Sequence, residues 1–458
     1  MRGKGEILLI STYELGHQPS GIAFPRAFLE RAGFHPAALD LAVEGIDEAC
    51  IVSARLVLFS VPMHTALRLA LHAAERVRAL NPDARLAYFG LYALLHAPLL
   101  RSAGACAVFG GECEEELVRL AQALERGLPP ESVWNDDRPA LAKLDFPVPS
   151  RTGLPPPDRY ARLLDPDGRE QLAGHTESSR GCKHACRHCP IPSVYGGRFF
   201  VIPPEVVMED LARQVAAGIT HVTFGDPDFL NGPRHAMRIA AELHARFPSL
   251  TFDFTAKIEH LVKHERLLPA LREAGALFAV SAVESLSERV LARLAKGHAR
   301  SDVFRAFAAC HTAGLSLRPS LLPFTPWSTL EDYLDLLETF RREQWLHSLD
   351  PVQLSLRLLI PPGSGLLPSQ GDPDLRLEGF DRSGLTWRWR HPDARMDALQ
   401  REVARAVEDA TLRGEAPAST FHRVHRLALS AAGRSRDPVP LGADTGKRAP
   451  RLTENWFC

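Results

Sequence analysis

Three cysteines within eight residues, Cys182, Cys186 and Cys189, constrain this chain more than any other feature of its sequence. A Cys-x3-Cys-x2-Cys run on one short loop brings three thiolates together, where they can hold a metal centre. Three thiolates can bind three irons of a [4Fe–4S] cube and leave the fourth iron without a protein ligand. The alternative is a structural zinc site with His184 or His188 as its fourth ligand.

The remaining cysteines favour the cluster over zinc. They are scattered singly, at Cys50, Cys106, Cys113, Cys310 and Cys458. Structural zinc sites usually pair two Cys-x2-Cys knuckles, and this sequence contains no second knuckle. The pattern predicts an iron–sulfur cluster.

The cysteine run resembles the cluster-binding loop of the radical SAM enzymes. That resemblance implies a [4Fe–4S] cluster whose open iron chelates S-adenosylmethionine (SAM), with reductive cleavage of the sulfonium to a 5′-deoxyadenosyl radical. Side chains alone cannot carry out this one-electron chemistry, so a redox cofactor is required. The resemblance also implies a flavodoxin- or ferredoxin-type electron donor.

The composition is that of a globular protein without an obligate charged partner. The 458 residues suffice for two or three domains, and the formal net charge of −1 argues against nucleic acid or an anionic membrane as partner. No apolar run reaches the roughly 18 residues that a membrane span needs. The start of the chain lacks a signal-peptide pattern, and the eight cysteines lack disulfide-like spacing. We therefore expect a cytoplasmic protein.

Residues 1–127 alternate apolar strand-like runs with amphipathic stretches, which indicates a doubly wound, Rossmann-like parallel sheet. Strands are expected at 7–11, 37–41, 56–60, 85–90 and 105–110, and helices at 21–32, 64–80 and 114–126. The segment resembles the B12-binding-type (cobalamin-binding) domain that precedes many radical SAM barrels. The Asp-x-His-x-x-Gly signature of that domain is absent, since His17 has no Asp at the required place. Cobalamin is therefore an open cofactor assignment.

A second α/β domain is expected after a linker. Residues 128–174 are rich in proline and read as the linker, because proline at this density sustains neither a helix nor a central strand. From 175 to 365 the alternation resumes, with strands expected at 176–179, 221–224, 251–255, 277–283, 316–322 and 352–360. Six βα units match the partial (β/α)6 barrel of the radical SAM superfamily. Its chemistry is expected at the C-terminal ends of the strands.

A turn directly after the expected strand 221–224 supplies the first SAM candidates. It reads Gly225-Asp226-Pro227-Asp228, a composition that on its own indicates only a turn. Radical SAM proteins place a Gly-rich acidic turn here, whose backbone and carboxylate meet the SAM amino group. The resemblance therefore makes Gly225, Asp226 and Asp228 candidates for SAM binding.

Glu284 and Ser285 are further candidates. They begin the run Glu284-Ser-Leu-Ser287, which Lys296-Gly-His298 follows. This resembles the E/Q-S-x-S…K-x-G-H pattern of several radical SAM groups, in which the acidic or amide residue faces SAM. Helix capping is the alternative role for Ser285.

Two cations in or after strands complete the candidates. Lys257 follows strand 251–255 and is assigned to the SAM carboxylate, with a solvated lysine as the alternative. Arg318 lies inside an apolar strand and needs a partner, which a carboxylate of SAM or substrate would provide.

The end of the chain adds a narrower resemblance. Residues 366–433 are expected to form a small α/β extension with an edge strand at 387–391 and a helix at 393–412. Residues 434–458 are expected to form a flexible tail that ends in Trp456-Phe457-Cys458.

The cysteine loop, the Gly-Asp-Pro-Asp turn and this ending resemble the CUAEP/CCAEP-tail radical SAM proteins. We therefore expect a UGA selenocysteine codon after Cys458, which is a candidate catalytic thiol. The alternative is that Trp456 and Phe457 only hold a frayed chain end in place.

The sequence thus predicts a radical SAM enzyme that modifies a small-molecule or peptide substrate. A cobalamin-dependent radical SAM methyltransferase is the first alternative. A zinc or iron–sulfur scaffold or redox sensor, without catalysis, is the second.

Overall fold

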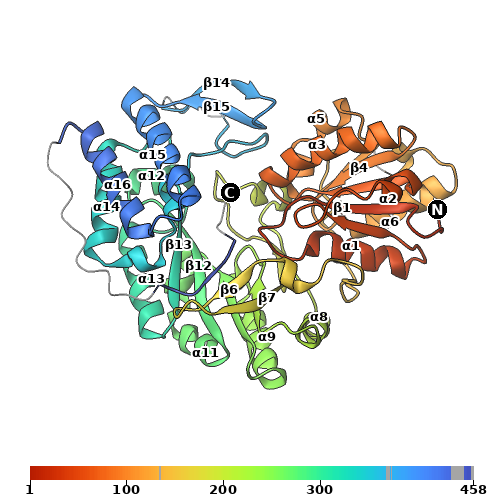
Figure 1. Cartoon of the computed structure of the whole chain (residues 1–458), viewed down its shortest axis with the longest axis horizontal. Coiled ribbons are helices and arrows are strands. Elements are labelled where there is room, and N and C mark those ends of the chain that lie inside the picture. Colours follow the sequence, from red (N-terminus) through yellow and green to blue (C-terminus); the bar gives the residue numbers. More distant parts are fainter. Residues whose placement is uncertain (134–135, 368–371, 373, 435–447, 455–458) are drawn as a thin grey trace.

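A computed structural model describes residues 1–133, 136–367, 372, 374–434 and 448–454. Within them the chain forms an N-terminal α/β body and a larger C-terminal α/β body that lie side by side (Figure 1). No helix in these described residues is long and apolar enough to cross a membrane.

The N-terminal body is a five-stranded parallel sheet with strand order β2-β1-β3-β4-β5. Its strands are β1 Ile7–Ser11, β2 Ala37–Asp40, β3 Leu56–Ser60, β4 Arg85–Phe89 and β5 Ala107–Phe109. Its helices are α1 Ser20–Arg31, α2 Glu48–Ser53, α3 His64–Leu80, α4 Leu91–Leu95, α5 Ala97–Ser102 and α6 Glu114–Glu125. The doubly wound sheet expected from the sequence is confirmed.

Both faces of this sheet are covered, which explains why its strands are almost continuously apolar. All five residues of β1 and all five of β3 are buried. One face packs against α2, α3 and α5, and the other against α1 and α6 (Figure 1). The carboxyl ends of the strands face the C-terminal body, because residues that follow β1, β2 and β5 contact it.

The C-terminal body is built on a seven-stranded sheet with order β13-β12-β11-β10-β7-β6-β16. Five strands are parallel: β7 Glu170–Thr176, β10 His221–Phe224, β11 Thr251–Thr255, β12 Ala276–Glu284 and β13 Ser316–Leu321. β6 Arg162–Leu164 and β16 Arg451–Leu452 join antiparallel at one edge. The sheet curls into a half-barrel, as the sequence predicts.

Helices cover the outside of the half-barrel (Figure 1). They are α8 Pro204–Ala216, α9 Pro233–Arg246, α10 Ile258–Lys263, α11 Leu268–Glu273, α12 Glu288–Leu294, α13 Arg300–Thr312 and α14 Leu330–Arg342. Short 3₁₀ helices are η1 Pro130–Ser132, η2 Pro157–Arg159, η3 Phe229–Asn231, η4 Glu265–Leu267, η5 Trp345–Ser348 and η6 Pro351–Leu354.

Two smaller units complete the body. A hairpin of β8 Ser179–Gly181 and β9 Phe199–Val201, with α7 Ile191–Tyr195 between its strands, frames the cysteine loop. The hairpin β14 Arg376–Asp381 and β15 Thr386–Arg390 precedes the helices α15 Ala394–Leu412 and α16 Pro417–Ala431. β15 and α15 confirm the strand and helix expected in the C-terminal extension.

Two barrel strands differ from expectation. The first lies at 170–176, not 176–179, because the chain turns at Glu177 to begin β8. The sixth expected strand, 352–360, makes only an isolated bridge between Phe324 and Arg357. Pro351, which lacks a backbone N–H, begins η6 there and prevents a ladder.

The expectation of a flexible tail over 434–458 is wrong for those of its residues that the structure describes. Arg451 and Leu452 form β16, and Leu452 is buried against Ala161 and Ala173. Beyond it, Glu454 accepts a hydrogen bond from Tyr13 of the N-terminal body (2.7 Å). The composition of the tail alone does not show that Leu452 packs against Ala161 and Ala173. Cys458 lies outside the described residues.

Candidate active site

The cysteine loop follows β8 through a turn that only glycine can make. Gly181 has φ +74°, and a Cβ there would lie 2.4 Å from the backbone oxygen of Arg198. Any larger residue would both strain the backbone and collide with β9. Cys182 therefore leaves the hairpin in a fixed direction.

The three thiols are free and lie on one eight-residue loop. Cys186 is buried and the other two are half-buried. Burial, with smaller contributions from the neighbouring Cys186 and Cys182 thiols, raises the pKa of Cys189 to about 12, while the backbone of Ile191 and the Lys296 ammonium oppose this rise. Such thiols bind metal by losing their protons to it.

The donor set fits a [4Fe–4S] cluster better than zinc. Zinc would take His184 or His188 as a fourth ligand beside the thiols. His184 instead faces His260 (Nε2 to Nε2, 3.2 Å), and His188 faces Glu284 (Nε2 to Oε1, 3.2 Å). Three thiols with no fourth ligand among the described residues match a cube with one open iron.

The rest of the loop is fastened to the ends of neighbouring elements. Lys183 donates from Nζ to the backbone oxygen of Asn231 (2.9 Å). The backbone N–H of Arg187 donates to the backbone oxygen of Leu294 at the end of α12 (2.9 Å). The loop thus lies against the carboxyl edge of the half-barrel, where barrel chemistry is located.

Arg180, two residues before Cys182, joins this loop to the N-terminal body. Its guanidinium contacts Glu177 (2.8 Å), Glu114 (2.5 Å) and Glu112 (3.6 Å). Glu112 and Glu114 follow β5, and Glu112 also accepts from Tyr195 (3.0 Å). A buried arginine held by several carboxylates fixes the two bodies relative to each other.

Gly225 and Asp226 lie at the edge of the sheet and are packed against other residues of the protein. A Cβ on Gly225 would lie 2.3 Å from Nε2 of His175, so no side chain fits there. Asp226 accepts from the backbone N–H of Ser178 (2.9 Å), from its hydroxyl (2.7 Å) and from the hydroxyl of Ser179. Burial raises the pKa of Asp226 to about 6 against these donors. Asp226 thus ties the turn after β10 to the start of β8, just before the cysteine loop.

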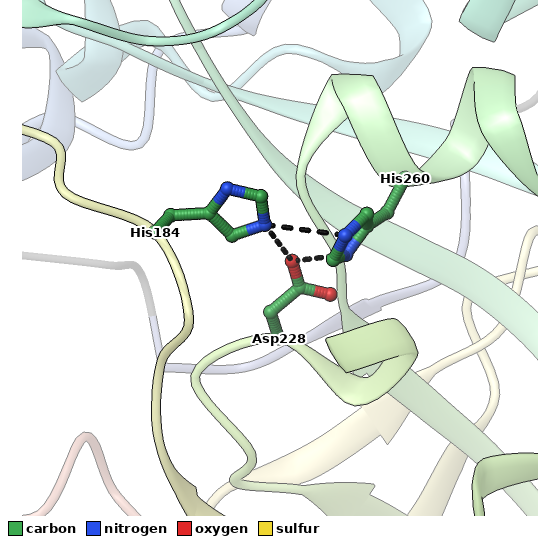
Figure 2. Close-up of side chains that lie close together, drawn as sticks. All are labelled: His184, Asp228 and His260. Carbon is green, nitrogen blue, oxygen red and sulfur yellow. Dashed lines mark hydrogen bonds and ion pairs between the residues drawn. The ribbon is translucent and has the colours of Figure 1, made fainter. Parts of the chain in front are cut away.

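Asp228 lies on the flank of the cysteine loop with two histidines. Its Oδ1 accepts from the backbone N–H of Leu230 (3.1 Å), and Oδ2 lies 2.7 Å from Nδ1 of His260 and 4.0 Å from Nε2 of His184. Figure 2 shows the three side chains pointing toward one another.

Glu284 stands at the end of β12 beside the thiols. Its backbone has φ +62°, a left-handed conformation that is strained for this residue type. Its buried carboxylate accepts from Nζ of Lys296 (3.1 Å) and Nε2 of His188 (3.2 Å). Burial alone would raise its pKa, but these two partners lower it to about 2. Ser285 accepts from the backbone N–H of Ser287 (3.1 Å), a turn contact.

Lys257 and Arg318 already have carboxylate partners. Lys257 is buried, not solvated, and its Nζ pairs with Glu259 (3.2 Å). Arg318 pairs with Asp350 and donates to the backbone oxygen of Pro450 (3.2 Å). The carboxylate that Arg318 needs is therefore supplied by the protein, and the structure does not bring Arg318 together with the cysteine loop.

The edge of the N-terminal sheet that faces the half-barrel is where such sheets bind cofactors. Among the described residues, each histidine ring at this edge already contacts another group of the protein. His17 stacks on His175 (4.6 Å between ring centroids), His64 bonds the backbone oxygen of Gly384 (2.7 Å) and His96 that of Leu385 (3.2 Å). The position fits a cobalamin-type ligand, but these residues offer the cobalt no free imidazole.

Sequence reasoning missed Lys296 and His260. Lys296 was visible in its motif, but nothing in the sequence indicated its electrostatic interaction with Cys186 and Cys189. His260 lies on α10, far along the chain, and only the fold brings it to His184.

One family model overlaps the region of the site. Residues 176–338 match the radical SAM superfamily. The tRNA-2-methylthio-N(6)-dimethylallyladenosine synthase of Deinococcus radiodurans is 26% identical over 207 residues, 41% of this chain and 39% of that protein. The hopanoid C-2 methylase of Rhodopseudomonas palustris is 26% identical over 131 residues, 28% of this chain and 25% of that protein. The chain spans less than half the length of these two relatives.

Two solved structures share the fold over most of the chain. The radical SAM methyltransferase TsrM from Kitasatospora setae, with cobalamin and [4Fe–4S] cluster bound, has a TM-score of 0.66 and 16% identity, covering 93% of this chain and 99% of that one. The cobalamin-dependent SAM radical enzyme OxsB, with aqua-cobalamin and SAM bound, has a TM-score of 0.69 and 15% identity, covering 89% of this chain and 67% of that one. At these identities the likeness shows the fold alone.

Proposed function

We propose that this chain, whose residues 176–338 form a radical SAM domain, is a radical SAM enzyme that modifies a small-molecule or peptide substrate. The observation that carries the proposal is the position of three free thiols, Cys182, Cys186 and Cys189, on one loop that is hydrogen-bonded to the carboxyl edge of the half-barrel. A [4Fe–4S] cluster bound there supplies the electron for reductive cleavage of SAM.

The residues around the thiols have roles that follow from their contacts. Lys296 places a buried positive charge beside Cys186 and Cys189, which stabilises thiolates. Glu284 holds that ammonium in place and restrains His188. Arg180 and Asp226 fix the chain just before Cys182. These contacts keep the loop in position as a cofactor binds.

We assign SAM to the carboxyl ends of β10, β11 and β12. Lys257 offers a buried ammonium, and Glu284 and Ser285 offer polar groups beside the thiols, while Gly225 leaves room for His175 to pack against the turn. Asp226 supports this site by holding the turn after β10, whereas Arg318 is bonded to Asp350 and Pro450 and is not part of it.

The test is anaerobic reconstitution with iron and sulfide, followed by dithionite and SAM, with 5′-deoxyadenosine as the measured product. We expect product from the wild type and none above background from Cys186→Ala. A matched control is Cys106→Ala, outside the loop, which should retain the activity. Product from Cys186→Ala equal to wild type would rule out the assignment. A flavodoxin or ferredoxin should replace dithionite as electron donor.

A cobalamin-dependent radical methyltransferase is the second candidate. What supports it is the doubly wound N-terminal body with its strand ends facing the half-barrel, a fold shared with cobalamin-bound structures. Incubation with hydroxocobalamin and gel filtration should then give protein with a corrinoid visible spectrum. Because His17 is stacked and buried, His17→Phe should bind as well as the wild type. Protein that emerges free of corrinoid would exclude this candidate.

The narrower proposal is membership of the CUAEP/CCAEP-tail group, with Cys458 as a reactive thiol. Its support is the ending Trp456-Phe457-Cys458 together with β16, which leads the chain to the contact between the two bodies. Sequencing the gene past the codon of Cys458 checks the selenocysteine expectation. A Cys458→Ser variant with full turnover would exclude a catalytic role for this thiol.

A further inference from the structure

We propose that His184, Asp228 and His260 bind a divalent first-row transition-metal ion next to the cysteine loop. The three residues come from three separate places: the loop itself, the turn after β10, and helix α10. Their ligand atoms all lie within 4.8 Å of one another (Figure 2). Two imidazoles and one carboxylate are a donor set that such ions favour.

The spacing suits one small ion. Ligands bound at about 2.0–2.2 Å around a tetrahedral or octahedral ion lie roughly 3–3.6 Å apart. Nε2 of His184 lies 3.2 Å from Nε2 of His260 and 4.0 Å from Oδ2 of Asp228. Oδ2 also lies 2.7 Å from Nδ1, the other ring nitrogen of His260. One ion in this group therefore requires small movements of both the half-buried His184 and the His260 ring, so that His260 presents a single nitrogen to the ion.

Buried atoms at the centre of this group lack hydrogen bonds. Asp228 is fully buried and His260 is 7% exposed, yet Oδ2 of Asp228 and Nδ1 of His260 have no hydrogen-bond partner among the described residues. The two atoms are 2.7 Å apart without hydrogen-bond geometry. A buried carboxylate oxygen without a donor is costly, and a cation at this point removes that cost.

An outer carboxylate completes the arrangement. Glu259 lies 3.5 Å from Nδ1 of His184, the ring nitrogen that points away from the other two residues. Histidines that bind metal through one nitrogen usually donate the other N–H to a carboxylate or carbonyl, which fixes the tautomer. Glu259 therefore orients His184 for binding through Nε2.

This site is separate from the thiol site and gives Asp228 a role other than SAM contact. Three protein ligands leave coordination positions open, so the bound ion would also hold water or a substrate group beside the loop. Because His184 lies between Cys182 and Cys186, the ion also ties the loop to β10 and α10.

The test measures metal content of the reconstituted protein with zinc as the probe. Cluster-loaded protein is equilibrated with a small excess of Zn²⁺, passed through gel filtration, and its iron and zinc are counted by mass spectrometry. We expect about one zinc beside about four irons per chain in the wild type. Asp228→Asn and His260→Ala should keep the iron and lose most of the zinc. His264→Ala, one helical turn along from His260, is the matched control and should keep both.

A second readout covers variants that fold poorly. Zn²⁺ should raise the thermal unfolding midpoint of the wild type and of His264→Ala, but not of Asp228→Asn or His184→Gln, because an ion that binds only the folded state stabilises it. Wild-type protein without zinc, or variants that retain it equally, would overturn the proposal. Loss of zinc with normal 5′-deoxyadenosine formation would uphold this site independently of the proposed activity.

Discussion

The ion pair of Lys296 and Glu284 (Nζ to Oε1, 3.1 Å) lies beside the thiols. Both side chains are buried, and the lysine also acts electrostatically on Cys186 and Cys189. Burial would disfavour either charge alone, so each depends on the other. The pair therefore contributes to both the stability of this region and the charge of the thiol site.

Replacing Lys296 by Met should destabilise the fold strongly. The substitution leaves the Glu284 carboxylate buried beside only His188, and breaking such a pair costs about 3–5 kcal/mol. We expect a lower thermal unfolding midpoint, partly restored in Lys296→Met/Glu284→Gln because the unpaired charge is then gone. Lys143→Met, on the exposed surface, is the control. Identical melting of Lys296→Met and wild type would contradict the pairing.

At the residue scale, the sequence predicted groupings of residues that are close together in the chain. It missed contacts between residues that only the fold brings together. The thiols of Cys182, Cys186 and Cys189 are neighbours in sequence, so their position on one loop was predictable. The partner of Arg318 was not, because Asp350 lies beyond the next helix and competes with any ligand. His260 shows no sequence pattern at all.

At the scale of secondary-structure elements, the sequence also failed to predict the short strands at the edge of the sheet. β1 and β3 were predictable because burial on both faces demands continuous apolar runs. β6 and β16 contain three and two residues, and each exists only through its pairing with a distant partner. Their short runs carry too little periodicity to be recognised.

Leu452 tests whether β16 is integral to the half-barrel. It is 7% exposed and packs with Ala161 and Ala173. Leu452→Ala should lower the free energy of unfolding by at least about 2 kcal/mol, the usual cost of a buried leucine side chain. Leu412→Ala, at a position 81% exposed, should change it little. Equal midpoints for the two variants in thermal unfolding would show that β16 contributes nothing.

For the whole molecule, the stacked rings of His17 and His175 predict an acid-sensitive contact between the two bodies. Burial lowers the pKa of both to about 3, from about 6.5 when unfolded. The folded state thus binds fewer protons than the unfolded state between these values. Its stability is complete above pH 6.5 and falls as the pH drops toward 3.

His17→Phe keeps a ring in the stack and removes one titration. At pH 5.5 one such histidine accounts for about 1.4 kcal/mol of lost stability. We expect the difference in melting midpoint between pH 7.5 and pH 5.5 to be smaller in His17→Phe than in the wild type, and unchanged in the exposed His35→Phe. An unchanged pH dependence in His17→Phe would contradict the burial of this pair.

The central claim is that three thiolates hold a cluster with one iron open to SAM. The most direct measurement is the electron paramagnetic resonance spectrum of anaerobically reconstituted, dithionite-reduced protein, recorded without and with SAM. We predict about four irons per chain and a reduced-cluster signal that SAM changes, since SAM binds the open iron. Protein that contains zinc in place of iron, or a cluster signal that SAM leaves unaltered, would contradict the account.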